Sequence, residues 1–134
     1  MELKKVMGWL SGFPGFAGYQ WEVDCLPHKP DTVTLTPKGI TVERTVENVL
    51  GGRKEELLFT CTVAFSGVKK TQVLLDLYKW VLLSTPPQLG EGHCWATVRD
   101  GRFLQKNKLG LDIYTAQLTV YFERFYEVNE NGKN

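Results

Sequence analysis

The chain has 134 residues, of which 43% are hydrophobic and 23% are charged, as expected of one globular domain with enough apolar residues to form a core. Its 16 Lys and Arg residues against 15 Asp and Glu residues give a net charge of +1, which does not indicate a general attraction to nucleic acid or to a bilayer. The longest apolar runs, such as residues 80–83, are too short to cross a membrane. We expect a single domain over residues 1–128 and a polar, disordered tail over residues 129–134.

The chain contains three cysteines, Cys25, Cys61 and Cys94, which lie far apart in the sequence. An odd number argues against a disulfide framework and favours a reducing, cytosolic setting. Each cysteine lies in a strand-like segment, where a thiol usually acts as a small buried hydrophobic group.

The first third of the chain contains one helical and two strand-like patterns. Residues 2–10 place apolar side chains at helical spacing and predict a short amphipathic helix. Residues 19–25 alternate between apolar and polar, as in a half-buried strand. Residues 32–36 are rich in β-branched side chains and lie between Pro30 and Pro37, which predicts a short edge strand.

The strongest local pattern is a predicted β-hairpin. Residues 40–47 and 57–65 both alternate, and Gly51-Gly52 between them allows the positive φ angles of a tight turn. The apolar stripe of the second strand consists of Leu57, Phe59, Cys61, Val63 and Phe65. A slip of one residue would turn this whole stripe to water, so its register should be firmly set.

The second half of the chain predicts a helix followed by two more strands. Over residues 71–83 the apolar period changes to 3.6, with Val73, Leu74, Leu77, Tyr78 and Val81 forming one stripe. Residues 93–99 alternate again, Asp100-Gly101 predicts a turn, and residues 111–128 predict the last strand. The pattern favours an α+β fold, mainly an antiparallel β-sheet with a protruding hairpin and two α-helices packed on one face.

The sequence carries no recognisable catalytic motif. It contains no phosphate-binding glycine loop, no nucleophile elbow, no zinc-protease motif and no closely paired cysteines. His93 and Cys94 are adjacent, and adjacent side chains of a strand point to opposite faces. A zinc site built from Cys25, His28, Cys61 and His93 would lack the paired spacing of structural sites. We therefore expect no enzymatic activity, cofactor or metal.

One basic segment could bind nucleic acid. Basic side chains interleaved with an aromatic one can hold a phosphate backbone and stack a base. The alternative is a charged hairpin end that keeps the sheet soluble, which we favour. The residues of this segment, which could also line the lumen of an assembly, are Arg99, Arg102, Lys106 and Lys108, with Phe103 among them.

A second group of charges surrounds the predicted hairpin tip. It carries both signs and two apolar neighbours, so it could either solubilise a long β-arm or set the register against another copy of the chain. The candidate interface residues are Glu43, Arg44, Glu47, Val49, Leu50, Arg53, Lys54 and Glu55.

Several segments together resemble the minor capsid or tail terminator proteins of long-tailed phages and prophages of Gram-positive bacteria. The resemblance covers residues 1 to about 127 and lies in the order of the segments along the chain and in their residue patterns. They are the opening MELKKV with Leu10 and Phe13-Pro14, WEVDCL at 21–26, KEELLFTCTVAF at 54–65, LDLYKW at 75–80 and YTAQLTVYF at 114–122.

This resemblance implies a structural role in the virion. Such proteins are α+β subunits that form a ring, usually of six copies, which caps the tail tube and presents a surface to the head completion proteins. The implied partners are other copies of the chain, the major tail tube protein and the head completion proteins, with DNA only in passage and no membrane. The implied locations are the virion and, during assembly, the host cytoplasm. The alternatives are another head–tail connector or tail-tube component, or a small oligonucleotide-binding β-domain.

Overall fold

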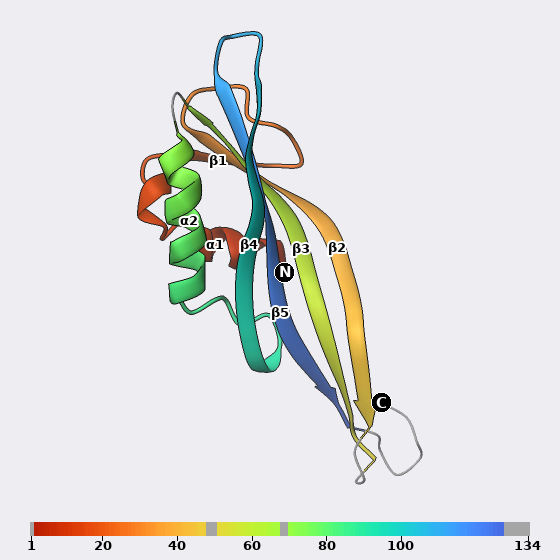
Figure 1. Ribbon diagram of the computed structural model, residues 1–134. Helices are drawn as coiled ribbons and strands as arrows, with labels where there is room; N and C mark the ends of the chain where they lie inside the picture. Colours follow the sequence, from red (N-terminus) through yellow and green to blue (C-terminus); the bar gives the residue numbers. More distant parts are fainter. Residues whose placement is uncertain (1, 48–50, 68–69, 128–134) are drawn as a thin grey trace.

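The computed structural model describes residues 2–47, 51–67 and 70–127 and shows a mixed α+β fold in which strands predominate (Figure 1). The α+β class predicted from the sequence is therefore confirmed. The predicted tail over residues 129–134 and the candidate residues Val49 and Leu50 lie outside the described residues. The elements are α1 (Glu2–Leu10), a 3-10 turn (Pro14–Phe16), β1 (Gln20–Val23), β2 (Thr32–Glu47), β3 (Arg53–Gly67), α2 (Thr71–Leu83), β4 (Glu91–Lys106) and β5 (Asp112–Tyr126).

The described strands form one sheet in the order β1-β2-β3-β5-β4. The pairs β2–β3, β3–β5 and β4–β5 are antiparallel, whereas β1 runs parallel to the start of β2. Because β1 pairs only with residues 32–35, the rest of β2 is one lateral edge of the sheet and β4 is the other. In Figure 1 the distal parts of β2, β3 and β5 continue past both helices. We call these distal parts (residues 39–47, 53–58 and 121–126) the arm.

The predicted short edge strand over residues 32–36 is wrong in two respects. It continues without a break into the strand predicted at 40–47, and its outer side pairs with β1. Pro37 does not end the strand because the register with β3 shifts between Pro37 and Gly39. Proline is tolerated at such irregularities of a ladder, where it interrupts little regular hydrogen bonding.

The predicted turn at Asp100-Gly101 is also wrong. β4 passes through both residues, and the register with β5 shifts between Arg99 and Arg102. Asp100 has φ 56°, a left-handed conformation that Asp adopts more readily than most residues. The dipeptide therefore accommodates an irregularity within β4. The chain reverses later, where the side-chain amide oxygen of Asn107 accepts the N–H groups of residues 109 and 111 at 2.9 and 3.0 Å.

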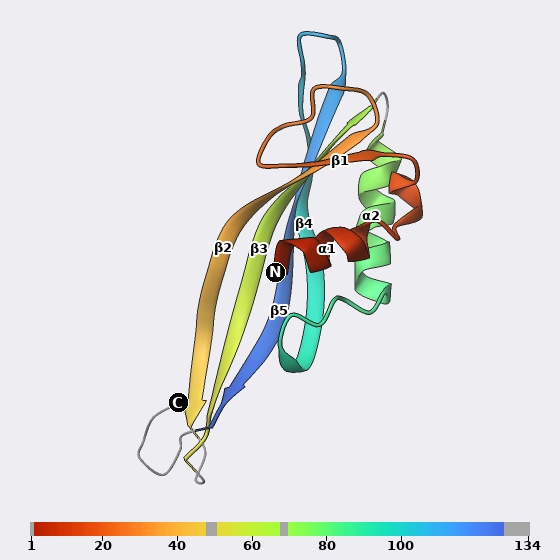
Figure 2. The same ribbon diagram turned by 180° about the vertical axis from the view of Figure 1, so that it is seen from behind.

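One cluster of buried apolar side chains joins the sheet to both helices, whose arrangement Figure 2 shows from behind. The predicted stripe of β3 is buried, with each of its five side chains at most 5% exposed. Val6 and Leu10 of α1 and Leu77 and Val81 of α2 complete the same cluster. The indole rings of Trp9 and Trp80 join the two helices, with ring centroids 5.2 Å apart.

Candidate functional site

Ion pairs clamp the three strands of the arm together. Arg44 of β2, Glu56 of β3 and Glu123 of β5 lie opposite one another in one cross-strand row. The Arg44 guanidinium donates two hydrogen bonds to the Glu56 carboxylate, from Nε at 3.0 Å and from Nη2 at 2.8 Å. The Lys54 ammonium lies 3.4 Å from Glu56 and 3.2 Å from Glu123. A shared network of this kind fixes strand register better than separate surface pairs do.

Glu123 is the least exposed member of this network, at 8% of its accessible surface. Its carboxylate accepts the backbone N–H of His93 at 2.9 Å and the hydroxyl of Tyr121 at 3.2 Å. The His93 N–H and the neighbouring ammonium group hold the pKa of Glu123 below its ordinary value. Burial, together with the adjacent carboxylate, raises the pKa of Tyr121 to about 12. Both groups therefore keep one protonation state at neutral pH and act as fixed structural partners.

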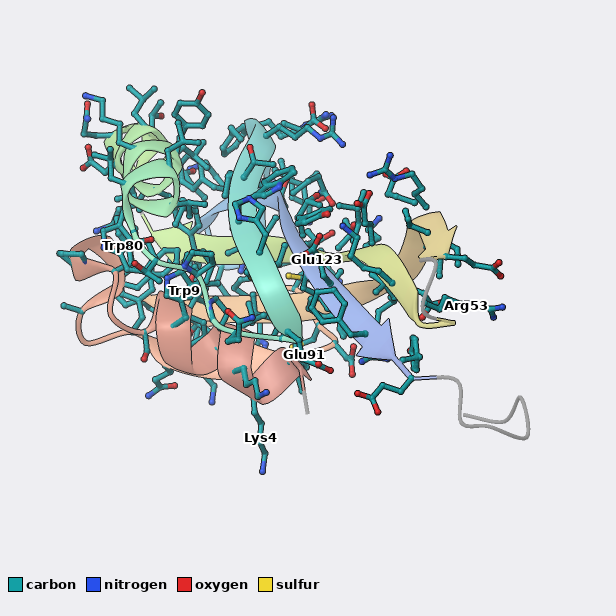
Figure 3. The ribbon with its side chains drawn as sticks, turned by 90° about the horizontal axis from the view of Figure 1, so that it is seen from below. Lys4, Trp9, Arg53, Trp80, Glu91 and Glu123 are labelled. Carbon is teal, nitrogen blue, oxygen red and sulfur yellow. The ribbon has the colours of Figure 1, made fainter. Side chains whose placement is uncertain are left out.

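The segment that precedes β4 approaches Glu123 closely through Gly90. A Cβ atom at this position would overlap the backbone carbonyl oxygen of Glu123 and lie 3.0 Å from the ring of Phe122. Only glycine allows the segment to cross β5 so closely. The crossing brings the N–H of His93 to the Glu123 carboxylate, as Figure 3 illustrates by the position of Glu91 near Glu123.

The candidate interface charges at the hairpin tip are largely engaged within the chain. Arg53 pairs with Glu47 at 2.9 Å, at the end of the arm opposite to the two tryptophans in Figure 3. Arg44 and Lys54 belong to the network just described. Within the described residues, Glu43 and Glu55 are the two candidates that form no ion pair. A role of the whole group in an interface remains a prediction.

The four basic residues considered for nucleic-acid contact do not come together in one cluster. Arg99 lines a hollow between α2 and β4, separate from the one that Arg102 lines. Lys106 forms an ion pair with Asp112 at 2.6 Å, and Lys108 lies in the turn that follows β4. Arg102 lines a hollow of about 450 Å³ that crosses the sheet and has Lys38 among its other lining residues. The sequence contains no signal for Lys38. Lys38 of β2 and Arg102 of β4 line the same hollow only because β2, β3, β5 and β4 are arranged side by side in the sheet.

The three thiols are held in their protonated form. Cys61 is fully buried, and burial raises the pKa of its thiol to about 12. Burial also raises the pKa of Cys94, whose Sγ lies 3.2 Å from the carbonyl oxygen of Pro87. The pKa of Cys25 is raised by desolvation and by the carboxylate of Glu22. A protonated thiol is a poor nucleophile and a poor metal ligand.

Part of the predicted stripe of α2 faces solvent. Leu77 and Val81 are buried as expected, but Tyr78 is 47% exposed. Leu75 and Leu82, which lie on the same side of the helix as Tyr78, are 55% and 51% exposed. The sequence predicts one apolar stripe that includes Tyr78, but the spacing alone does not say which part of that stripe the sheet covers.

The described part of the chain contains no cluster of three or more His, Cys, Asp or Glu side chains that could hold a metal ion. Over the same residues, no helix combines the length and the apolar character that a membrane crossing requires. A comparison with protein-family models and a search of curated proteins both gave no match.

Proposed function

We propose that this chain is a structural assembly protein of a tailed phage or prophage: a tail terminator or minor capsid component whose copies form a ring on the end of the tail tube and join it to the head. The proposal starts from the resemblance of its segments to that family. On this proposal the chain is not an enzyme. Its partners are other copies, the major tail tube protein and the head completion proteins, in the virion and in the host cytoplasm.

The shape of the arm supports an assembly role. We propose that the β2–β3 hairpin protrudes from the domain while the two helices pack on one face of the sheet. The ion pairs of Arg44, Lys54 and Glu56 give the arm a fixed shape. A rigid projection loses little conformational entropy when it docks, which favours its use in a specific contact.

The observation that carries the proposal is the exposure of apolar side chains at both lateral edges of one sheet. At the β2 edge, Ile40 and Val42 are 46% and 49% exposed. At the β4 edge, α2 presents Leu75, Tyr78 and Leu82. A closed ring requires two different patches on each subunit, and patches on opposite edges let each copy contact two neighbours.

Native mass spectrometry combined with negative-stain electron microscopy of the full chain tests this function. We expect ring-shaped particles of a single stoichiometry, six according to the resemblance, whose population rises with protein concentration. A protein that stays monomeric at its highest soluble concentration and does not bind the ends of purified tail tubes would contradict the proposal.

The hollow between β2 and β4 favours a second candidate, the binding of an oligonucleotide. Lys38 and Arg102 line it together with Leu104 and one acidic residue, Asp100. The ring of Phe103 is 52% exposed nearby along β4. Cations beside exposed apolar groups suit a single strand. Fluorescence anisotropy with a short labelled DNA should then show affinity that falls with salt and is lost in Arg102→Glu but retained in Lys4→Glu. No binding by the unmodified protein at low salt would exclude this candidate.

A further inference from the structure

The face of the sheet opposite to the buried stripe of β3 carries polar side chains and one stacked aromatic pair. Trp95 of β4 lies opposite Tyr121 of β5, and the two alternate with the core residues Ala96 and Val120. Their rings are stacked, with centroids 5.3 Å apart and 8° between the planes. Trp95 is 42% exposed, so its ring is accessible from this face. We call this side of the sheet the polar face, and its central side chains are those of Thr60, Thr62, Trp95, Thr97, Gln117, Thr119 and Tyr121.

The hollow of about 450 Å³ opens on the polar face and contains an available hydrogen-bond donor. Thr62 and Gln117, both in its lining, lie opposite each other on β3 and β5. The hydroxyl of Thr62 donates to the amide oxygen of Gln117 at 3.0 Å, and no described residue accepts a hydrogen bond from the amide nitrogen of Gln117. That nitrogen is therefore free to donate to a ligand.

Two cations border the same hollow from the two edges of the sheet. Lys38 comes from β2 and Arg102 from β4. Neither forms an ion pair with a described residue, and the same holds for Asp100, the acidic residue of the lining. The lining therefore has a net positive charge. Two unpaired cations beside an amide donor favour an oxyanion such as a phosphate group.

The aromatic pair and the hollow lie on one line along β5. Tyr121 and Gln117 are four residues apart and share the polar face, which separates them by about 14 Å of strand. The row between them consists of Thr60, Thr119 and Thr97, which lie opposite one another on β3, β5 and β4. These side chains are short and uncharged, so an extended ligand on this face can contact both the ring of Trp95 and the hollow.

We propose that the polar face binds a single-stranded oligonucleotide, with one base stacked on Trp95 and with phosphate groups held by Lys38 and Arg102. This inference rests on the second candidate function and names its surface and contacts. An aromatic ring accepts the flat face of any base, and cations hold the backbone of any sequence, so binding should show little sequence preference. Because Trp95 is already stacked on Tyr121, its ring loses little freedom when a base docks.

The combination of a ring and cations favours a single strand over the other anionic polymers. In a duplex the bases are paired and stacked inside, so their flat faces cannot reach a ring on the surface of a sheet. An acidic peptide would use Lys38 and Arg102 but would have no base to place on Trp95. Only a single strand offers unstacked bases and phosphates together.

Fluorescence anisotropy separates the two kinds of contact, with a labelled oligothymidine of about eight nucleotides as the probe. Trp95→Ala should weaken binding about fivefold or more and leave the salt dependence unchanged. Two phosphate contacts to a single strand predict a slope of about −1.4 for log affinity against log salt concentration. Arg102→Gln removes one contact and should reduce this slope to about −0.7.

An abasic oligonucleotide of the same length tests the stacking itself, because it keeps the phosphates and lacks the bases. The wild type and Trp95→Ala should bind this second probe equally weakly, whereas Trp95→Phe should retain most of the affinity for oligothymidine. The matched controls are Tyr78→Ala, which removes an exposed aromatic ring from α2, and Lys4→Glu, which reverses an exposed charge on α1. Both should bind as the wild type does, and circular dichroism should show every variant folded.

The outcomes distinguish this inference from the function on which it rests. Oligothymidine binding that is unchanged in Trp95→Ala, or equal affinity of the wild type for the two probes, would overturn the inference and leave the candidate function intact. Binding of a glutamate-rich peptide in place of the oligonucleotide, or no binding of oligothymidine at low salt, would overturn both.

Discussion

Replacing Phe65 by alanine should remove a central element of the core. The Phe65 side chain is fully buried, with its ring centroid 5.4 Å from that of Phe16 and 5.3 Å from that of Tyr114, on which it stacks. Truncation of a buried Phe to Ala costs about 3–5 kcal/mol of unfolding free energy. Because a small domain has only about 5–15 kcal/mol in total, this variant should be severely destabilised or unfolded.

A milder substitution keeps the effect measurable. Phe65→Leu retains an apolar side chain of comparable size but loses the stacking on Tyr114, so we expect a loss of about 1–2 kcal/mol. Leu109→Ala is the control, because that exposed turn residue should change stability by less than about 0.5 kcal/mol.

Urea denaturation followed by circular dichroism measures these changes through the midpoint and the slope of the transition. The expected order of stability is wild type and Leu109→Ala, then Phe65→Leu, then Phe65→Ala. If the Phe65 variants were as stable as the control, the apolar stripe of β3 could not face the core. The register of the sheet would then be shifted by one residue.

Three further predictions follow from the close crossing at β5, the carboxylate network and the thiols. Gly90→Ala should lower the stability measured by thermal unfolding, because the added methyl group meets the backbone of β5. The control is Gly8→Ala in α1, where the space is open, and it should be neutral or stabilising by about 0.5–1 kcal/mol. The pKa of Glu123 is lower in the fold than the ordinary 4.5. Its contribution to stability is therefore fully present above 4.5 and is lost as the pH falls from that value through the lower pKa of the folded state. Glu123→Gln should flatten this acid dependence in denaturation measured at several pH values, and an unchanged dependence would refute the role of the carboxylate. In the folded protein an alkylating reagent should label the exposed Cys25 faster than the buried Cys61. Mass spectrometry of digested samples measures the two labelling rates, and equal rates would contradict the burial of Cys61.

Elements with a strong local pattern could be predicted from the sequence. The helices over residues 2–10 and 71–83 have the predicted bounds, since apolar spacing and breaking residues mark both ends. The stripe of β3 was correctly predicted because period-two alternation depends only on which face is buried. The hairpin between β2 and β3 was also correct in its pairing.

The predictions from the sequence were wrong where tertiary contacts determine the local structure. Asp100-Gly101 has the composition of a turn, but pairing with β5 on both sides keeps the dipeptide within β4 as an irregularity of that strand. Residues 32–36 were predicted to be an edge strand, because nothing in their own sequence indicates that β1 pairs with them in parallel. The exposed stripe of α2 and the approach of Lys38 to Arg102 depend on how the elements are arranged, which one sequence does not encode locally.

Native mass spectrometry of the full chain over a range of concentrations tests the proposed assembly role most directly. The account predicts one closed stoichiometry, six copies according to the resemblance, because a head-to-tail contact that closes into a ring leaves no free edge. A chain that stays monomeric at its highest soluble concentration and does not bind the ends of purified tail tubes, or one that forms an open-ended series of oligomers, would contradict it.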